Sequence, residues 1–377
     1  MRLTITALNN NNMTPADIYQ QALKDNSISP DPAQQKAVDC LDRLHDQLRE
    51  QWQSRQTFIH RLKSNFGGNT ATPVRGYYFW GGVGRGKTFL MDLFFESLPF
   101  DEKLRMHFHR FMQMVHHRLR ELKDIENPLC KVANDLAGRT RVLCFDEFHV
   151  ADITDAMILG GLLKSLFERG VTLVATSNEH PDQLYHDGLQ RDRFLPAIEL
   201  IKQHTHVEHI DSGVDYRLQF LDRAEIYHTP LDDRAEAMLQ ENFEHMALEA
   251  TPESTSLDVE GRRITAVRVA GDVVWFEFNA ICDGPRGAAD YIEIARCFHT
   301  VLVANVPVMN DNQADMARRF MTLVDEFYDH NVKLIITAAA PPAELYNGNK
   351  IKKSFARTIS RLNEMATHDY LARQHLP

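Results

Sequence analysis

The chain has 377 residues, of which 44% are hydrophobic and 25% charged, as in ordinary globular proteins. Acidic residues outnumber basic residues by 52 to 42, and the net charge of −10 argues against a protein whose whole surface attracts nucleic acid, although a local basic groove is compatible with it. The five cysteines are scattered and no two form a C-x-x-C pair, so neither a disulfide framework nor a zinc site is expected. No apolar run approaches the roughly 20 residues of a membrane helix, and the N-terminus does not resemble a signal peptide, so we expect a cytoplasmic protein without a transmembrane segment.

The beginning of the chain differs from the rest in composition. Residues 1–12 are polar and low in complexity, and we expect them to be disordered. In residues 13–72, Thr14 with Pro15 and Asp31 with Pro32 are typical of helix starts, and apolar residues recur at helical spacing after each pair. A Gly- and Thr-rich linker ends this segment. The sequence therefore predicts a helical N-terminal segment that leads into the next region.

Residues 73–215 alternate short apolar strands with helices, which predicts an α/β fold with a parallel sheet covered on both faces. The predicted strands span residues 77–80, 104–108, 142–145, 171–176 and 204–209, and the predicted helices span residues 87–98, 112–122 and 156–168. Residues 216–377 predict an additional C-terminal α/β region. Within it, residues 264–269 and 273–278 are expected to form an antiparallel pair around Gly271.

A glycine-rich loop follows the first of these strands and fits the pattern G-x-x-x-x-G-K-[ST] in full. Glycines let the backbone turn with positive φ, so that successive N–H groups and the N-terminus of the next helix face a phosphate. We expect Lys87 to reach the β- and γ-phosphates of ATP and Thr88 to place its hydroxyl on Mg²⁺. The expected nucleotide-binding residues are Gly81, Gly82, Val83, Gly84, Arg85, Gly86, Lys87 and Thr88.

Two acidic residues, Asp146 and Glu147, follow the predicted strand 142–145. In open α/β sheets, ligands bind at the carboxyl ends of the strands. Asp146 is expected to hold Mg²⁺ through water, and Glu147 to orient and deprotonate the attacking water. Two acids after an apolar run are a weak signal alone, but they become a strong one roughly 60 residues after a P-loop.

Three further polar residues are candidates for catalysis. Asn178 follows the strand 171–176 and is expected to hold the lytic water; the alternative is that it caps the next turn. Arg191 and Arg193 lie on a short polar turn, where one of them is a candidate arginine finger for a neighbouring subunit. The alternative is that both are solvated arginines paired with nearby aspartates.

The sequence also suggests an internal repeat. Shifted by 161 positions, residues 157–185 fall on residues 318–346 without a gap, and Thr176 falls on Thr337. The polar positions do not carry over, since Asp146 meets Pro307. Chance similarity between two strand–helix–strand units is the alternative. In both cases only the first region carries residues for an ATP site.

Four histidines, at positions 107, 109, 116 and 117, invite comparison with a metal site. The first two would share one face of a strand, whereas the other two lie on the following helix, and no cysteine or carboxylate completes a set. We therefore expect them to lie beside the nucleotide rather than to bind a metal.

Taken together, several segments resemble a family of AAA+ ATPases that includes bacterial cell-division proteins and mitochondrial relatives called AFG-like or lactation-elevated ATPases. The resemblance covers nearly the whole chain from Met13. The segments that carry it are residues 73–88, 106–112, 143–148, 152–157, 175–178, 188–196, 317–320 and 360–365. Many of them are not general features of P-loop proteins, so the resemblance is specific.

The resemblance implies an AAA+ core, ATP hydrolysis, assembly into a homo-oligomer and a cytoplasmic role at the division ring with FtsZ as partner. It also implies residue roles. Asn178 would be sensor 1, and Arg191 or Arg193 would be the arginine finger. Arg361, with Arg357 as the alternative, would make a sensor-2-type contact with the nucleotide.

Different functions remain open at this point. The first is an energy-converting ATPase that remodels FtsZ polymers or another protein client. The alternative is a slow, nucleotide-gated scaffold or adaptor at the inner face of the membrane or at the division site. A nucleic-acid loader or translocase is a weaker option, and no stable binding of nucleic acid is expected.

Overall fold

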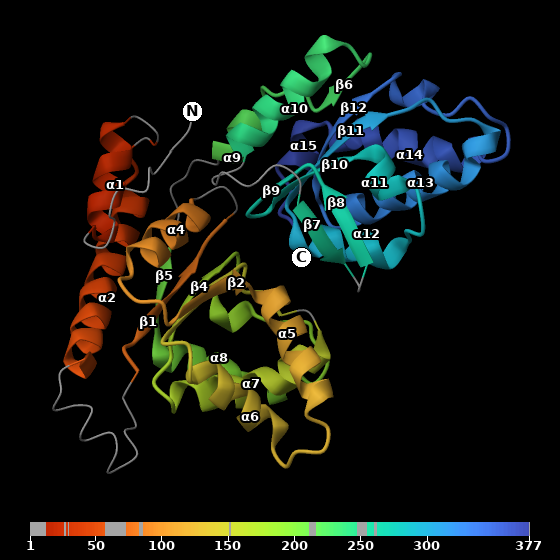
Figure 1. Cartoon of the computed structure of the whole chain (residues 1–377). Coiled ribbons are helices and arrows are strands. Elements are labelled where there is room, and N and C mark those ends of the chain that lie inside the picture. The colour runs from red at the N-terminus through yellow and green to blue at the C-terminus, as the bar shows by residue number, and fades with distance from the viewer. Residues whose placement is uncertain are drawn as a thin grey trace. The chain divides into compact units, whose positions relative to one another are not determined.

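The structure is a computed structural model (Figure 1). It describes residues 13–25, 28, 30–56, 73–82, 86–150, 152–210, 216–246, 255–259 and 262–376. The expected disorder of residues 1–12 and the middle of the glycine-rich loop, residues 83–85, fall outside these ranges. The chain divides after Val214 into two compact units, which are described separately. Within the described ranges, no helix combines the length and the apolar character that crossing a membrane requires.

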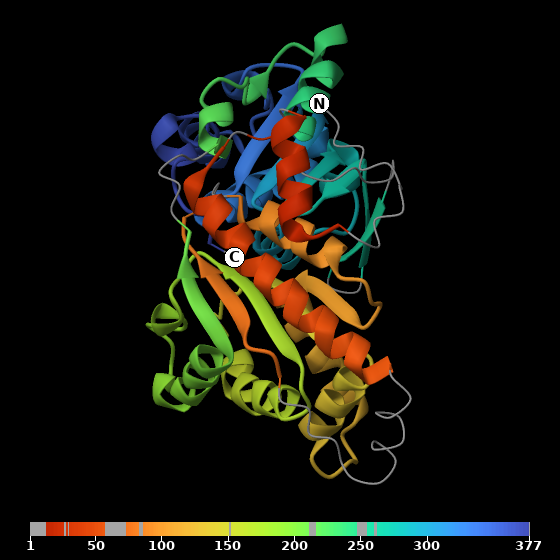
Figure 2. The same ribbon diagram turned by 90° about the vertical axis from the view of Figure 1, so that its left-hand side faces the viewer.

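Two helices open the first unit, α1 (Pro15–Lys24) and α2 (Pro32–Gln56). Thr14 and Asp17 form a capping box at the start of α1, and the Asp31 carboxylate accepts the first free N–H groups of α2. The apolar residues that recur at helical spacing in α2, namely Val38, Leu41, Leu44 and Leu48, are buried. Figure 2 shows α2 running across one face of the sheet.

The sheet of the first unit has five parallel strands in the order β2-β3-β4-β1-β5. These strands are β1 (Gly76–Trp80), β2 (Lys103–His107), β3 (Val142–Asp146), β4 (Thr172–Ser177) and β5 (Thr205–His209). Alternate residues point to opposite faces: Tyr77 and Phe79 pack with α2 and α4, whereas Tyr78 packs with the helices of the other face. The predicted α/β fold with a covered parallel sheet is confirmed.

Helices cover both faces of this sheet (Figure 1). They are α4 (Lys87–Ser97), α5 (Phe108–Glu121), α6 (Pro128–Ala137), α7 (Ile153–Phe167) and α8 (Leu195–His204), with short 3₁₀ turns η1 (Pro181–Gln183) and η2 (Arg191–Arg193). The sequence analysis missed α6 and α8. Both have a proline in their first turn, Pro128 and Pro196, a signal that could have located them.

The second unit contains a five-stranded sheet in the order β6-β12-β11-β10-β9, in which only β9 is antiparallel to its neighbour. Its strands are β6 (Tyr227–His228), β9 (Arg268–Ala270), β10 (Val273–Glu277), β11 (Thr300–Val306) and β12 (Lys333–Ala338). Its helices are α9 (Tyr216–Leu221), α10 (Asp233–Met246), α11 (Phe278–Cys282), α12 (Ala288–Cys297), α13 (Ala314–Asp329), α14 (Lys352–Met365) and α15 (His368–Leu371), with 3₁₀ turns η3 (Asp311–Gln313) and η4 (Pro342–Glu344).

The predicted antiparallel pair of the second unit is correct only in part. β9 pairs with β10 around Gly271, as expected. The residues before β9 form a separate strand, β8 (Arg262–Ala266), which pairs with β7 (Thr255–Val259) in a hairpin of its own. Alternating apolar residues identify a strand but do not identify its partner, and this explains the error.

The repeat suggested by the sequence is present in the structure. Helix α13, strand β12 and turn η4 begin 161 positions after α7, β4 and η1, respectively. The turn that links helix to strand is also the same: the N–H of Val171 donates to the carbonyl of Leu166, and the N–H of Val332 donates to the carbonyl of Phe327. The two units thus share a strand–helix–strand block.

Candidate active site

Both described ends of the glycine-rich loop lie where only glycine fits. Gly81 has φ +155°, and a Cβ there would lie 2.1 Å from the carbonyl oxygen of Ile210. Gly86 has φ +76°, and a Cβ there would lie 2.7 Å from Nε2 of Gln34. Gln34 is a buried residue at the start of α2 that the sequence analysis missed. The loop therefore packs closely against its surroundings at both ends.

Lys87, the first residue of α4, lies at the carboxyl edge of the sheet. Its Nζ atom donates to the carbonyl oxygens of Gly81 at 2.6 Å and Gly82 at 2.7 Å. It also donates to Oδ1 of Asn178 at 2.9 Å. Asn178 directly follows β4, whose last residue pairs with the last residue of β1. The structure thus brings together two candidates that are 91 positions apart in the sequence.

The two acidic candidates lie at the same edge of the sheet. Asp146 is the last residue of β3, and its side chain is only 9% exposed. Glu147 has a left-handed backbone with φ 51°, a conformation that costs about 1–2 kcal/mol outside glycine. Its N–H donates to Oγ1 of Thr176 at 3.3 Å, which helps to hold this conformation. The carboxylate of Glu147 remains partly exposed, with Oε2 3.9 Å from Nδ1 of His107.

A mostly buried arginine that the sequence analysis missed contacts the first of these acids. Nε of Arg105 on β2 donates to Oδ2 of Asp146 at 2.7 Å, and its Nη1 donates to Oδ1 of Asp92 on α4. Burial alone would lower the pKa of Arg105, but the carboxylates of Asp146 and Asp92 outweigh burial and raise it. Arg105 is therefore a permanent cation between two carboxylates.

The donor atoms in this region suit a magnesium ion. Mg²⁺ prefers hard oxygen ligands, and it usually keeps several waters in addition to one or two protein ligands. The carboxylate of Asp146 and the hydroxyl of Thr88, the second residue of α4, are donors of this kind. These two residues could hold the ion together with the phosphates of a nucleotide.

The two candidate finger arginines differ in their contacts. Nη2 of Arg191 donates to the carbonyl oxygen of Asp182 at 2.6 Å, within the same unit. The side chain of Arg193 is exposed and has no hydrogen bond or ion pair with any residue that the structure describes. Within the same ranges, neither arginine pairs with Asp187 or Asp192, which was the alternative from the sequence. Arg193 is therefore the arginine available to another molecule.

Arg361 lies on α14 of the second unit, where its guanidinium is already engaged. Nη1 lies 2.7 Å from Oδ1 of Asp325, and Nη2 lies 3.0 Å from Oδ1 of Asp329. The guanidinium carbon also lies 4.5 Å from the centroid of the Tyr328 ring, and the side chain is 13% exposed. Arg357 has a longer contact of 3.6 Å with Asp325. These contacts favour a structural role, and a nucleotide contact by Arg361 stays a prediction.

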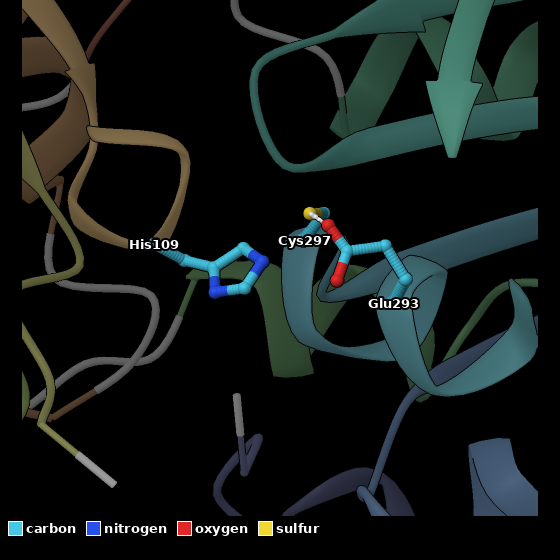
Figure 3. A group of neighbouring side chains, drawn as sticks. All are labelled: His109, Glu293 and Cys297. Atoms are coloured by element: carbon cyan, nitrogen blue, oxygen red, sulfur yellow. Dashed lines mark hydrogen bonds between the residues drawn. The ribbon is translucent and has the colours of Figure 1, made fainter. Parts of the chain in front are cut away.

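The histidines form no metal site within the described part of the first unit. Nε2 of His116 lies 2.6 Å from Oδ1 of Asp155, and His107 lies beside Glu147. Figure 3 shows Glu293 and Cys297 one turn apart on α12, where the thiol donates to the carboxylate at 3.7 Å. His109, also drawn there, belongs to α5 of the first unit. Because the placement of the two units relative to one another is not determined, we assign no metal site to these three side chains.

A parallel sheet with a glycine-rich phosphate loop after β1 and an Asp-Glu pair after β3 defines a P-loop ATPase. The model of one family, described as AFG1-like ATPase, matches residues 13–374. The chain therefore belongs to the AFG1-like ATPase family, and both the predicted family resemblance and the ATPase class are confirmed.

Similar proteins include bacterial and eukaryotic relatives. The chain is 45% identical to the cell division protein ZapE of Escherichia coli K12, over 97% of this chain and 99% of that protein. It is 39% identical to lactation elevated protein 1 homolog B of Danio rerio, over 79% of this chain and 62% of that protein.

Solved structures resemble part of the chain. DnaI matches 49% of this chain and 89% of its own chain with a TM-score of 0.35 and 18% identity. The DnaC helicase loader matches 52% of this chain and 99% of its own chain with a TM-score of 0.34 and 14% identity. Similarity at this level carries no argument about function.

Proposed function

We propose that the chain hydrolyses ATP in the presence of Mg²⁺ at the carboxyl edge of the first sheet. The observation that carries this proposal is the hydrogen bond of 2.9 Å between Lys87 and Asn178, beside the acids that follow β3. It joins the loop that would bind phosphate to the strand end that would orient water. A cation, an amide and two carboxylates within one edge of a sheet suit phosphoryl transfer to water.

Each residue has a distinct task in this proposal. The loop N–H groups and the ammonium of Lys87 bind the β- and γ-phosphates. Thr88 and Asp146 hold the magnesium ion, which when bound neutralises charge on the phosphate oxygens. Glu147 accepts the proton of the attacking water, and Asn178 orients that water toward the γ-phosphate. No step of this mechanism requires Arg361, whose described contacts lie within its own unit, and its sensor-2-type contact with the nucleotide remains a separate prediction.

A second copy of the chain completes the site. Arg193 is exposed at η2, and Leu189, two positions before this turn in the sequence, is 70% exposed. A mixed apolar and cationic surface of this kind suits contact with another subunit, where Arg193 would neutralise charge that develops on the γ-phosphate. We assign the finger to Arg193 rather than Arg191, because Arg191 is already bound to Asp182.

The cellular role is proposed from similarity to ZapE, which is named a cell division protein. The chain would act in the cytoplasm at the division ring, with FtsZ polymers as its client. The test is the ATPase rate of the full chain with FtsZ polymer, with single-stranded DNA and with neither. Stimulation by polymer is expected. A flat, slow rate would point instead to a nucleotide-gated scaffold, and stimulation by DNA alone would point to a nucleic-acid loader.

A further inference from the structure

Arg105 links two elements that must cooperate in the proposed site. Asp92 lies on α4, the helix that starts with Lys87 and Thr88. Asp146 ends β3, the neighbour of β2 in the sheet. The guanidinium of Arg105 reaches both carboxylates, and the side chains of Arg105, Asp92 and Asp146 are 16%, 17% and 9% exposed. The phosphate-loop helix and the acidic strand are thus joined by one buried cation.

The contact with Asp146 fixes the orientation of its carboxylate. Nε of Arg105 lies 2.7 Å from Oδ2, and Nη2 lies 3.4 Å from Oδ1, so both oxygens face the same guanidinium. A planar guanidinium restrains the plane of a carboxylate, whereas an ammonium acts as a point charge. The remaining lone pairs of Asp146 therefore have a set direction.

Charge alone does not explain this arrangement. Burying one cation with two carboxylates costs desolvation energy, and packed apolar side chains often stabilise a fold equally well. The bridge does connect the two protein groups suited to the metal, because Thr88 lies at the start of α4 and Asp146 at the end of β3. Their separation depends on how firmly α4 is tied to β3.

We propose that Arg105 is a positioning residue for the magnesium ion of the ATP site: it orients the carboxylate of Asp146 and ties it, through Asp92, to the helix that carries Thr88. This role rests on the proposed function in one respect, namely that Asp146 faces the metal. Arg105 itself touches neither nucleotide nor metal in this role.

The test measures metal binding rather than turnover. In the full chain carrying Glu147→Gln, which slows hydrolysis, Mn²⁺ is titrated in the presence of ATP and free Mn²⁺ is followed by electron paramagnetic resonance. Adding Arg105→Lys keeps the charge but removes the planar fork. We expect the Mn²⁺ concentration at half-saturation to rise about tenfold, which corresponds to about 1.4 kcal/mol, while the affinity for ATP without metal changes less than about twofold.

Two further variants separate positioning from folding. Asp92→Asn keeps the contact between Arg105 and Asp146 and weakens the link from Arg105 to α4, so its half-saturation should lie between those of the parent and Arg105→Lys. Arg118→Lys alters an exposed arginine on α5 that pairs only with Glu121 among the described residues, and it should match the parent. If the Mn²⁺ concentration at half-saturation is unchanged in both Arg105→Lys and Asp92→Asn, the positioning role is overturned. This holds even if the variants have lower thermal stability. A parent protein that binds ATP but no Mn²⁺ would instead overturn the metal site of the proposed function, and this role with it.

Discussion

Four strands have the same order in the two units of the chain, but different residues lie where these strands end. In the first unit β2, β3, β4 and β1 are neighbours in that order, and in the second unit β10, β11, β12 and β6 are. Each set is parallel and follows the same order along the chain. The units therefore share a topology over four strands as well as the repeat in sequence.

The left-handed residue that follows β3 has a counterpart inside β11. Glu147 has φ 51° and donates its N–H to Oγ1 of Thr176, whereas Asn305 has φ 61° and donates its N–H to Oγ1 of Thr337. Phe145 pairs with Ala175 as Val303 pairs with Ile336, so Asn305 takes the place of Glu147, and the alignment at a constant shift, which put Asp146 on Pro307, was wrong here by three positions. The side chain is what differs, because Asn305 is not acidic. The left-handed residue with its threonine partner is therefore a property of the fold, and the carboxylate of Glu147 is what the first unit adds.

The loop after the first strand of each set shows the larger difference. In the first unit, residues 81–86 link β1 to α4 and include four glycines. In the second unit, residues 229–232 link β6 to α10 and include none. A shorter loop without glycine cannot wrap a phosphate with successive N–H groups. The second unit thus has the topology of these four strands without the glycine-rich loop and without the acidic residues at the strand end.

The largest expected effect comes from the loop lysine. Lys87→Ala removes the ammonium that binds Asn178 and both loop carbonyls, and with it the cation for the phosphates. We expect ATP hydrolysis to fall to background, as measured by phosphate release. Hydrolysis at the wild-type rate in this variant would show that the first unit is not the site.

The exposed arginine should give the next largest effect. Arg193→Ala should reduce turnover by roughly 10³–10⁵-fold and leave ATP affinity nearly intact, because a finger acts on the transition state. Arg191→Ala is the matched control and should have a smaller effect on turnover. Mixing Arg193→Ala with Lys87→Ala should restore activity, since each lacks a different half of a shared site. Failure to restore it, with activity independent of protein concentration, would place the arginine in its own chain's site or in a structural role.

Glu147 and Asn305, the corresponding residues with left-handed backbones, offer a matched pair of substitutions. Glu147→Gln keeps the size of the side chain but removes the base, so hydrolysis should slow by about 10²–10⁴-fold while ATP still binds. Asn305→Asp changes the equivalent position of the second unit and should leave the rate unchanged. Loss of ATP affinity in Glu147→Gln would mean that this residue holds the metal or the fold.

The smallest expected effect concerns the folding stability of the second unit at acidic pH. Burial lowers the pKa of His375 to about 4, reinforced by His330 and Lys333 and opposed by Asp272 and by its hydrogen bond to the carbonyl of Ala295. The unfolded imidazole, with a pKa near 6.5, therefore binds its proton first as the pH falls. The contribution of His375 to stability is complete above pH 6.5 and declines toward pH 4, by about 2 kcal/mol at pH 5.

This acid response can be measured by thermal unfolding of the full chain at pH 7.5 and pH 5. The melting temperature should fall, and it should fall less in His375→Gln, which keeps a hydrogen-bond donor but cannot take up the proton. If the melting temperatures of the unchanged chain and of His375→Gln fall equally between pH 7.5 and pH 5, then His375 is not the cause of the loss of stability in acid.

The sequence predicted the parts of the site that are encoded by contiguous residues. The glycine-rich loop with Lys87 and the acids after β3 are local patterns, and their position after buried strands follows from hydrophobic periodicity. Arg105 was missed because its partners, Asp92 and Asp146, lie on two other elements and meet it only through the packing of α4 and the pairing of β2 with β3. Ion pairs between residues that are far apart in the chain produce no recognisable pattern of spacing in the sequence.

The same limit applies to the fold. The parallel sheet was predictable from apolar strands that alternate with helices, but the pairing of β8 with β7 rather than with β10 was not, because register depends on tertiary contacts. The engagement of Arg361 by Asp325 and Asp329 likewise depends on the packing of α14 against α13.

The central claim is that only the first unit binds nucleotide, and counting bound ATP tests it most directly. Isothermal titration calorimetry of the Glu147→Gln protein with ATP and Mg²⁺ gives the number of sites per chain. The same titration of the double variant, Glu147→Gln with Lys87→Ala, shows whether that site is the loop of the first unit. We expect one bound ATP per chain in Glu147→Gln and none in the double variant that also carries Lys87→Ala. Two sites per chain, or one that survives Lys87→Ala, would contradict it.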